Sequence, residues 1–334
     1  MTLPRVLVVD DSAFARTLLS RVLRDSGQVD VVGTAREGHD ALAKIDELDP
    51  DVVTLDLTMP ELDGIGVLRA LAGRPRPRVL VVSISGVDTE LGAEALALGA
   101  VDLVTKPTAV ASERLGEIAG ELLSKIGAIT ERAPSATARS ATARPATRAE
   151  LVMIGTSTGG PQALTQIVSA LPAGLRAPVT MVLHIPAEYT AALAERLDRA
   201  SPLHVVEASE GLVLEPGLVV LARGGTHLRV EARAGKLVTA LGTQPKRAFV
   251  PAVDELFASG ARAVGAGALG VVLTGMGDDG LEGARAIAAA RGSLITEAAS
   301  TCVVYGMPRS VYEAGLGAQS VPLHRIAEEI ASRV

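Results

Sequence analysis

The sequence has few aromatic residues: no tryptophan, three tyrosines and three phenylalanines among 334 residues. Its cores must therefore be built from valine, leucine, isoleucine and alanine, and it offers no aromatic platform for stacking nucleic-acid bases. A surplus of basic residues is lacking too, because 38 acidic residues outnumber 32 basic ones and the net charge is −6. Since nucleic acid is bound mainly through basic groups, we expect no nucleic-acid partner.

Cys302 is the single cysteine, which excludes an internal disulfide and a thiolate-rich metal site. Long apolar runs are missing as well, since the best candidate, Ala261–Gly277, is broken by Arg262 and by glycines. The N-terminal residues lead into a strand pattern without the apolar segment of a signal peptide. We therefore expect a cytoplasmic protein that does not insert directly into a membrane, and the length of the chain suits two domains.

The first part of the chain alternates short runs rich in valine, isoleucine and leucine with helical patterns. Parallel strands need crossover helices, so this repeat predicts a five-stranded parallel sheet with helices on both faces. The expected strands are Val6–Asp10, Val29–Ala35, Val52–Asp56, Val79–Ser83 and Val101–Thr105.

Polar residues stand at the carboxyl ends of these strands, where open α/β sheets build their sites. They are Asp10, Asp11, Asp56, Ser83 and Lys106. Crowded carboxylates repel one another unless a hard cation lies among them, and a small set of oxygen ligands suits Mg²⁺. A carboxylate in such a site can attack a phosphoryl group while the cation and a lysine neutralise its charge.

The stretches VVDDS, TLDLTMPELDGI, VVSIS and ALALGAVDLVTKP resemble a response-regulator receiver domain. The resemblance implies a flavodoxin-like doubly wound fold and a sensor histidine kinase as phosphodonor. It also implies roles for individual residues: Asp56 as phosphoacceptor, Asp10, Asp11, Asp56 and the carbonyl of Thr58 as Mg²⁺ ligands, and Ser83 and Lys106 as phosphoryl contacts. Leu103 stands where receivers usually carry an aromatic switch residue.

A segment of low complexity, ERAPSATARSATARPATRAE, follows at residues 131–150 and lacks large apolar side chains. Such a composition cannot form a core and is typical of a flexible tether. We therefore expect a receiver domain over residues 1–128, a flexible linker over 129–149 and a second domain over 150–334.

The second domain opens on Leu151–Gly160, LVMIGTSTGG, an apolar strand pattern that ends in a glycine-rich turn. Gly155 to Gly159 fit the pattern G-x-S-x-G, in which small neighbours allow a sharp turn that exposes Ser157 beside backbone N–H groups. The pattern alone leaves three interpretations open: a nucleophile, an ordinary strand-to-helix loop or a phosphate cradle.

Two further strand patterns of this domain end in chemically active residues. Val179–Leu183 is followed by His184, and Leu269–Leu273 by a turn that holds Asp278 and Asp279. Serine, histidine and aspartate are the set needed for a nucleophile, its base and the acid that orients the base. Their chain order differs from the serine, aspartate, histidine order of the α/β-hydrolases, so membership of that fold is not predicted.

The remaining histidines and the middle of the domain carry weaker signals. His204, His227 and His324 are expected to be structural or exposed. Irregular strand candidates in the middle predict an inserted β-hairpin, and a helix is expected after them. These elements are Leu203–Val206, Leu218–Leu221, His227–Val230, Lys236–Thr239 and the helix Val250–Ala263.

The stretches GTSTGG, LHIPAEYTAALAERL, KRAFVPAVDELF, VLTGMGDDGLEGA and EAASTCVVYGMP resemble the catalytic domain of the CheB family of chemotaxis methylesterases. The resemblance implies a doubly wound, mostly parallel α/β methylesterase domain that needs no cofactor. It assigns Ser157, His184 and Asp279 to catalysis. The backbone N–H groups of Thr158 and Met276 are our candidates for the oxyanion hole. Relative to the family, the residues Ala-Phe-Val before Pro251 are an insertion.

These observations predict a phosphorylation-regulated serine esterase. By resemblance, its substrates are glutamate methyl esters on cytoplasmic helices of chemoreceptors, methanol is released, and receptor glutamines can also be deamidated. One alternative is a response regulator whose second domain only binds a partner. Another is the same esterase in a pathway other than chemotaxis.

Overall fold

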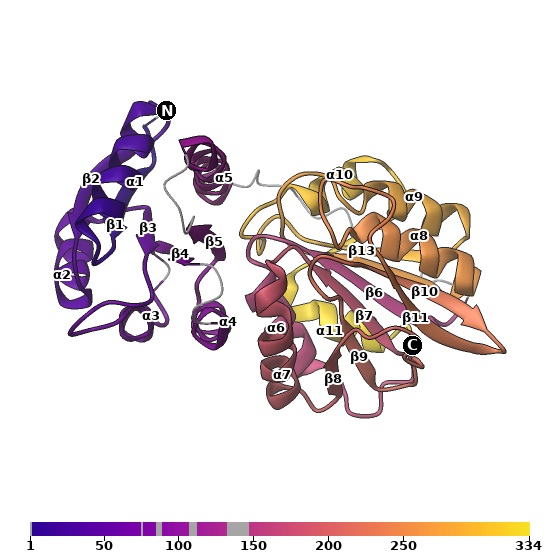
Figure 1. The fold of residues 1–334 in the computed structure, drawn as a ribbon. Helices are drawn as coiled ribbons and strands as arrows, with labels where there is room; N and C mark the ends of the chain where they lie inside the picture. Colours follow the sequence, from indigo (N-terminus) through magenta and orange to yellow (C-terminus); the bar gives the residue numbers. More distant parts are fainter. Residues whose placement is uncertain (1, 75, 85–88, 107–111, 132–146) are drawn as a thin grey trace. The chain divides into compact units, whose positions relative to one another are not determined.

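The structure of the chain is a computed structural model that describes residues 2–74, 76–84, 89–106, 112–131 and 147–334. Contacts divide the chain into two compact units, Met1–Arg132 and Ala133–Val334 (Figure 1). Most of the expected linker lies outside the described residues, and its first residues belong to the last helix of the first unit, which ends at Thr130. None of the described helices is long and apolar enough to cross a membrane.

The first unit is a five-stranded parallel sheet in the order β2-β1-β3-β4-β5, which confirms the predicted doubly wound fold. Helix α1 packs against α5, whereas α2, α3 and α4 contact one another in sequence, so two helix layers enclose the sheet. The strands are β1 Arg5–Val9, β2 Asp30–Ala35, β3 Val52–Leu55, β4 Arg78–Ile84 and β5 Asp102–Lys106. The helices are α1 Ala13–Asp25, α2 Gly38–Leu48, α3 Gly64–Leu71, α4 Thr89–Ala97 and α5 Ser112–Thr130.

The second unit is built on a seven-stranded parallel sheet in the order β14-β13-β12-β6-β7-β9-β8. The strands are β6 Leu151–Thr156, β7 Val179–Leu183, β8 His204–Glu207, β9 Leu218–Leu221, β12 Ala268–Val272, β13 Ser293–Glu297 and β14 Gln319–Val321. Strands β7 to β9 extend the sheet to one side of β6, and β12 to β14 extend it to the other. The strand order therefore reverses at β6, and such a switch point is where open α/β sheets bind ligands.

The residues of β6 show how the core is divided between the two faces of this sheet. Successive side chains of a strand point to opposite faces. Leu151 and Met153 belong to one buried apolar cluster, and Val152 and Ile154 belong to the other. The cluster of Val152 includes side chains of α6 Gly160–Ala170, α7 Thr190–Ala200 and α11 Leu323–Ala331. The cluster of Leu151 includes those of α8 Val253–Val264, α9 Leu281–Ala289 and α10 Met307–Glu313.

An antiparallel hairpin, β10 His227–Arg233 and β11 Lys236–Gly242, packs against α8 and confirms the predicted insertion. The helix expected from Val250 begins only at Val253. Pro251 explains the difference, because the residue before a proline is disfavoured in helical conformation. Strands β13 and β14 were not expected from the sequence. Short helical turns also occur at Ala187–Tyr189 and Gly265–Gly267.

Candidate active site

Ser157 and His184 directly follow two neighbouring strands. The last residues of β6 and β7, Thr156 and Leu183, are paired in register, and the His184 N–H donates to the Thr156 carbonyl at 3.2 Å. On the other side of β6, the Ser157 N–H donates to the carbonyl of Thr274, which follows β12, at 3.1 Å. The register of three parallel strands thus brings their polar ends to one edge of the sheet.

The third loop brings Asp279 to His184. The histidine Nε2 lies 2.8 Å from Asp279 Oδ2, and both side chains are less than a tenth exposed. Burial opposes ionisation of Asp279, but hydrogen bonds from His184 and from backbone N–H groups outweigh burial and lower the pKa of Asp279. Asp278, its neighbour, is exposed. The geometry therefore joins Asp279, rather than Asp278, to the imidazole.

The second imidazole nitrogen of His184, Nδ1, is buried and has no hydrogen-bond partner among the described residues. A carboxylate can only accept, so the bond to Asp279 keeps a hydrogen on Nε2. A neutral ring then carries a lone pair on Nδ1. This unpaired acceptor can take a proton from a group placed beside it.

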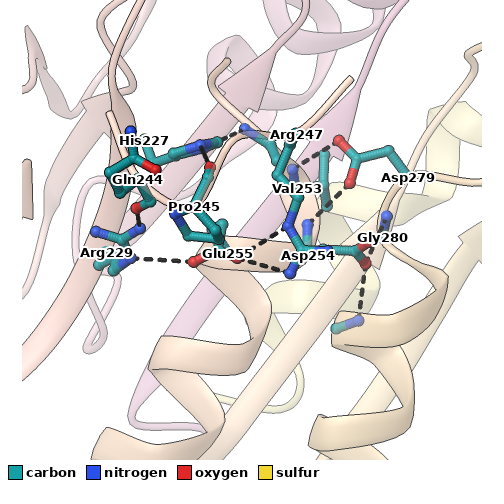
Figure 2. A network of polar contacts seen from close by, with 12 residues as sticks. His227, Arg229, Gln244, Pro245, Arg247, Val253, Asp254, Glu255, Asp279 and Gly280 are labelled. Atoms are coloured by element: carbon teal, nitrogen blue, oxygen red, sulfur yellow. Dashed lines mark hydrogen bonds and ion pairs between the residues drawn. The ribbon is translucent and has the colours of Figure 1, made fainter. Parts of the chain in front are cut away.

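Asp279 is also part of a reciprocal cap between two helices (Figure 2). Its carboxylate accepts from the N–H groups of Val253, at 2.8 Å, and Asp254, at 3.0 Å, at the start of α8. Asp254 in turn accepts from the N–H groups of Gly280, at 2.9 Å, and Gly283, at 2.8 Å, at the start of α9. Each helix start thus supplies the carboxylate that satisfies the other.

Asp254 was not recognised from the sequence. The available signal was an acidic residue in the first turn of a helix, where it complements the helix dipole. Burial and the neighbouring charge of Asp279 raise the pKa of Asp254, although its hydrogen bonds from Gly283 and Gly280 act in the opposite direction.

Two glycines shape the turn around Ser157. Gly159, the residue before α6, has φ of 81°, a conformation that favours glycine. Gly275 lies so close that a Cβ at this position would come within 2.9 Å of Ser157 Cβ. The strand-to-helix turn predicted for Ser157 is therefore present.

Of the expected oxyanion donors, Thr158 directly follows Ser157 in the same turn, and Met276 lies in the turn after β12. The Thr158 side chain is buried, and its carbonyl accepts from Thr274 Oγ1 at 2.9 Å. Within the described part of the chain, the Met276 N–H donates to no acceptor. A donor without a partner in the resting fold suits the stabilisation of a developing negative charge.

A buried carboxyl group that sequence reasoning missed is linked to the Ser157 turn through Thr274. Glu297, at the end of β13, is 0% exposed and accepts from the Thr274 N–H at 2.9 Å. The Thr274 carbonyl is the acceptor for the Ser157 N–H, so the contacts run in a chain from Glu297 to Ser157. Burial raises the pKa of Glu297.

The other histidines of this unit do not join Ser157, His184 and Asp279. His204 is exposed and pairs with Asp198 at 3.0 Å, and His324 is exposed. His227 is buried, with both ring nitrogens bonded to backbone groups. Their structural or surface positions agree with the expectation from the sequence.

The first unit gathers its polar strand ends around Lys106. Lys106 Nζ lies 2.6 Å from Asp10 Oδ2 and 2.7 Å from Asp56 Oδ2. Oxygen atoms of Asp10, Asp11 and Asp56 lie within 4.8 Å of one another. Burial raises the pKa of Asp10 despite its contact with Lys106. Closely spaced carboxylates with hard oxygen donors fit a magnesium ion.

The other expected receiver residues lie near strand ends of the same sheet. Ser83 is in β4 and buried, whereas Thr58 lies beyond β3 and is exposed. The backbone nitrogen of Thr58 lies 3.5 Å from Asp56 Oδ1. Leu103, at the position where receivers usually carry an aromatic switch residue, is buried in β5.

These features define a receiver-type unit joined to a doubly wound α/β unit that carries serine, histidine and aspartate at one sheet edge. Residues 6–117 match the model of the response regulator receiver domain, and residues 152–330 match that of CheB methylesterase. The chain belongs to the CheB methylesterase family.

Similar proteins cover nearly the whole chain. A protein-glutamate methylesterase/protein-glutamine glutaminase of Myxococcus xanthus is 55% identical, over 96% of this chain and 94% of the relative. One of Thermotoga maritima is 40% identical, over 99% of this chain and 98% of the relative. The crystal structure of the Thermotoga maritima CheB methylesterase catalytic domain matches 56% of this chain and 99% of its own, at 40% identity and a TM-score of 0.54.

Proposed function

We propose that the second unit hydrolyses the γ-methyl esters of glutamate side chains on chemoreceptors, with Ser157 as the nucleophile. As a CheB-family enzyme, the chain is a protein-glutamate methylesterase/protein-glutamine glutaminase. The observation that carries the assignment of residues is the 2.8 Å contact between His184 and Asp279. It leaves Nδ1 of a histidine unpaired at the sheet edge that also holds Ser157.

In the proposed reaction, His184 Nδ1 takes the hydroxyl proton of Ser157 as Oγ attacks the ester carbonyl carbon. Asp279 holds the Nε2 hydrogen and stabilises the imidazolium that forms. The N–H groups of Thr158 and Met276 stabilise the oxyanion. Collapse of the tetrahedral intermediate releases methanol, which receives the proton from His184. A water molecule, deprotonated by His184, then attacks the acyl-enzyme, and His184 returns the proton to the departing Ser157 Oγ, which leaves glutamate and the free enzyme. With a glutamine side chain the first leaving group is ammonia.

The receiver unit is proposed to control this reaction through phosphorylation of Asp56 by a sensor histidine kinase. Asp10, Asp11, Asp56 and the Thr58 carbonyl would hold Mg²⁺, which supplies charge neutralisation for phosphoryl transfer. Lys106 contacts Asp56 and is placed to contact a phosphoryl group on it. Ser83, in β4, is the second proposed phosphoryl contact. Because the proposed substrates are cytoplasmic helices of receptors, we propose that the reaction takes place in the cytoplasm.

Ser157→Ala tests the nucleophile directly. Methanol release from methylated receptor should fall by more than about 10³-fold, because the covalent step is lost. A fluorophosphonate probe should label the wild-type chain and not the variant. Ser169→Ala, which alters an exposed serine of α6, serves as the matched control. Wild-type turnover by Ser157→Ala would exclude the nucleophile, and absence of hydrolysis and labelling in the wild type would favour the partner-binding alternative.

A further inference from the structure

Phe249 is one of only three large hydrophobic residues that are exposed among those described, with 43% of its surface accessible. Its ring stacks on the imidazole of His184, with ring centroids 4.1 Å apart and an interplanar angle of 8°. This phenylalanine is the middle residue of Ala-Phe-Val, which directly precedes Pro251. An exposed aromatic ring that lies flat on the proposed base needs an explanation.

His227 forms hydrogen bonds with both ends of the loop that carries Phe249, at Pro245 and at Ala252 (Figure 2). The ring Nδ1 of His227 accepts from the Ala252 N–H at 3.1 Å, and Nε2 lies 2.9 Å from the Pro245 carbonyl. Because Nδ1 accepts, the hydrogen of a neutral ring is on Nε2 and is donated to Pro245. The fully buried side chain of His227 therefore links the two ends of the loop.

Further contacts hold the loop between these two ends. Arg247 pairs with Glu255 at 2.8 Å, and Glu255 also pairs with Arg229 at 3.1 Å (Figure 2). The Val250 carbonyl accepts from the Gly225 N–H at 3.0 Å. Phe249 thus stands on backbone that is fixed on both sides of it, and its position over His184 follows from the loop as well as from the stacking.

Asp279 alone does not fix the imidazole plane. A single hydrogen bond at Nε2 holds one edge of the ring and leaves the ring free to tilt about that contact. A parallel aromatic ring against one face restricts this tilt, because offset stacking is favourable only when the planes stay nearly parallel. The two contacts together fix the direction in which the unpaired Nδ1 points. The same ring also shields the imidazole, whose side chain is 7% exposed.

We infer that Phe249 is a positioning residue: its ring holds the imidazole of His184 in the plane from which Nδ1 accepts the serine proton. The inference rests on the proposed role of His184 as the base. Phe249 acts through His184 and takes no part in bond making.

The test compares Phe249→Ala, Phe249→Leu and Phe249→Tyr in the full chain, with methanol release from methylated receptor and fluorophosphonate labelling as readouts. Alanine and leucine should each lower kcat by roughly tenfold, because a misdirected base weakens proton transfer, with KM unchanged. The rate constant of labelling at Ser157 should fall by the same factor. Tyrosine keeps a flat ring and should restore both rates, whereas leucine keeps only the apolar bulk.

Each measurement is made with and without a small phosphodonor in Mg²⁺, and thermal unfolding is followed for every variant. Equal losses in both states support the inference. Full activity of Phe249→Ala, higher activity of Phe249→Ala, rescue by leucine, or a loss confined to one state would each overturn it. If the proposed function itself were wrong, Ser157→Ala would keep its activity or the wild type would have none, so the two failures are distinguishable.

Discussion

The Asp279 carboxylate has three donors on its two oxygens, one from an imidazole and two from the start of a helix. These contacts keep Asp279 ionised at neutral pH, as its lowered pKa requires. Asp278, one residue away, is exposed. Two adjacent acids of the same type therefore differ completely in what they contact.

Asp279→Asn should lower kcat by about 10³- to 10⁴-fold, whereas Asp278→Asn should leave turnover close to that of the wild type. The asparagine amide can donate to Nε2 of His184, which would move the ring hydrogen to Nδ1 and remove the base. Steady-state methanol release measures both variants. Equal damage from the two substitutions, or greater damage from Asp278→Asn, would contradict the assignment.

Residue types at strand ends identified Ser157 and His184 as candidates from the sequence alone. The same reasoning left Asp278 and Asp279 open, and only the family resemblance favoured Asp279. Which acid turns inward depends on the backbone of the turn, and that backbone is set by contacts with α8, far away in the sequence. Phe249 and Glu297 escaped notice for a similar reason, since a single aromatic or acidic residue carries no periodic signal.

At the scale of elements, helices α8 and α9 are joined at their first turns through Asp254 and Asp279. Asp254→Ala should lower the free energy of unfolding by about 1–2 kcal/mol, because the N–H groups of Gly280 and Gly283 lose their acceptor. Asp254→Asn keeps an acceptor oxygen and should lower it by less. Urea unfolding of the three proteins measures the difference.

The difference in unfolding free energy between Asp254→Asn and the wild type should depend on pH, with a sign that follows from the pKa of Asp254. The folded-state pKa of Asp254 is raised above 3.8, so its contribution to stability is complete below the unfolded pKa and falls as pH rises through the folded pKa. Asp254→Asn does not ionise. Its stability relative to wild type should therefore improve as pH rises through that range, and a constant difference in urea unfolding across the pH series would show that Asp254 does not titrate as described.

Strongly periodic elements could be predicted from the sequence, as the five strands of the first unit and strands β6, β7 and β12 show. The predicted start of α8 was wrong, and β13 and β14 were not predicted. β14 is only three residues long, Gln319–Val321, and β13 has just two apolar residues, Leu294 and Ile295, so neither has a pattern that local reasoning can detect. Their place in the sheet comes from pairing with strands that the preceding sequence has already positioned.

For the whole molecule, Asp56→Asn should abolish phosphoryl labelling by a small phosphodonor and any stimulation of methanol release by it. The amide cannot accept the phosphoryl group and no longer completes the cation site. Removal of Mg²⁺ by a chelator should give the wild type the same behaviour. Asp25→Asn, at an exposed acid of α1, is the control. Labelling that persists in Asp56→Asn would place the acceptor elsewhere.

The sharing of Asp279 between His184 and the start of α8 has a consequence for control of the enzyme. The carboxylate that binds the imidazole also accepts from the first N–H groups of α8, so one side chain serves both the site and the fold. A separate inactive form, folded but with the acid withdrawn, would leave helix N–H groups unsatisfied and is therefore disfavoured. Control by the receiver would then act on the arrival of substrate at a site that is already assembled.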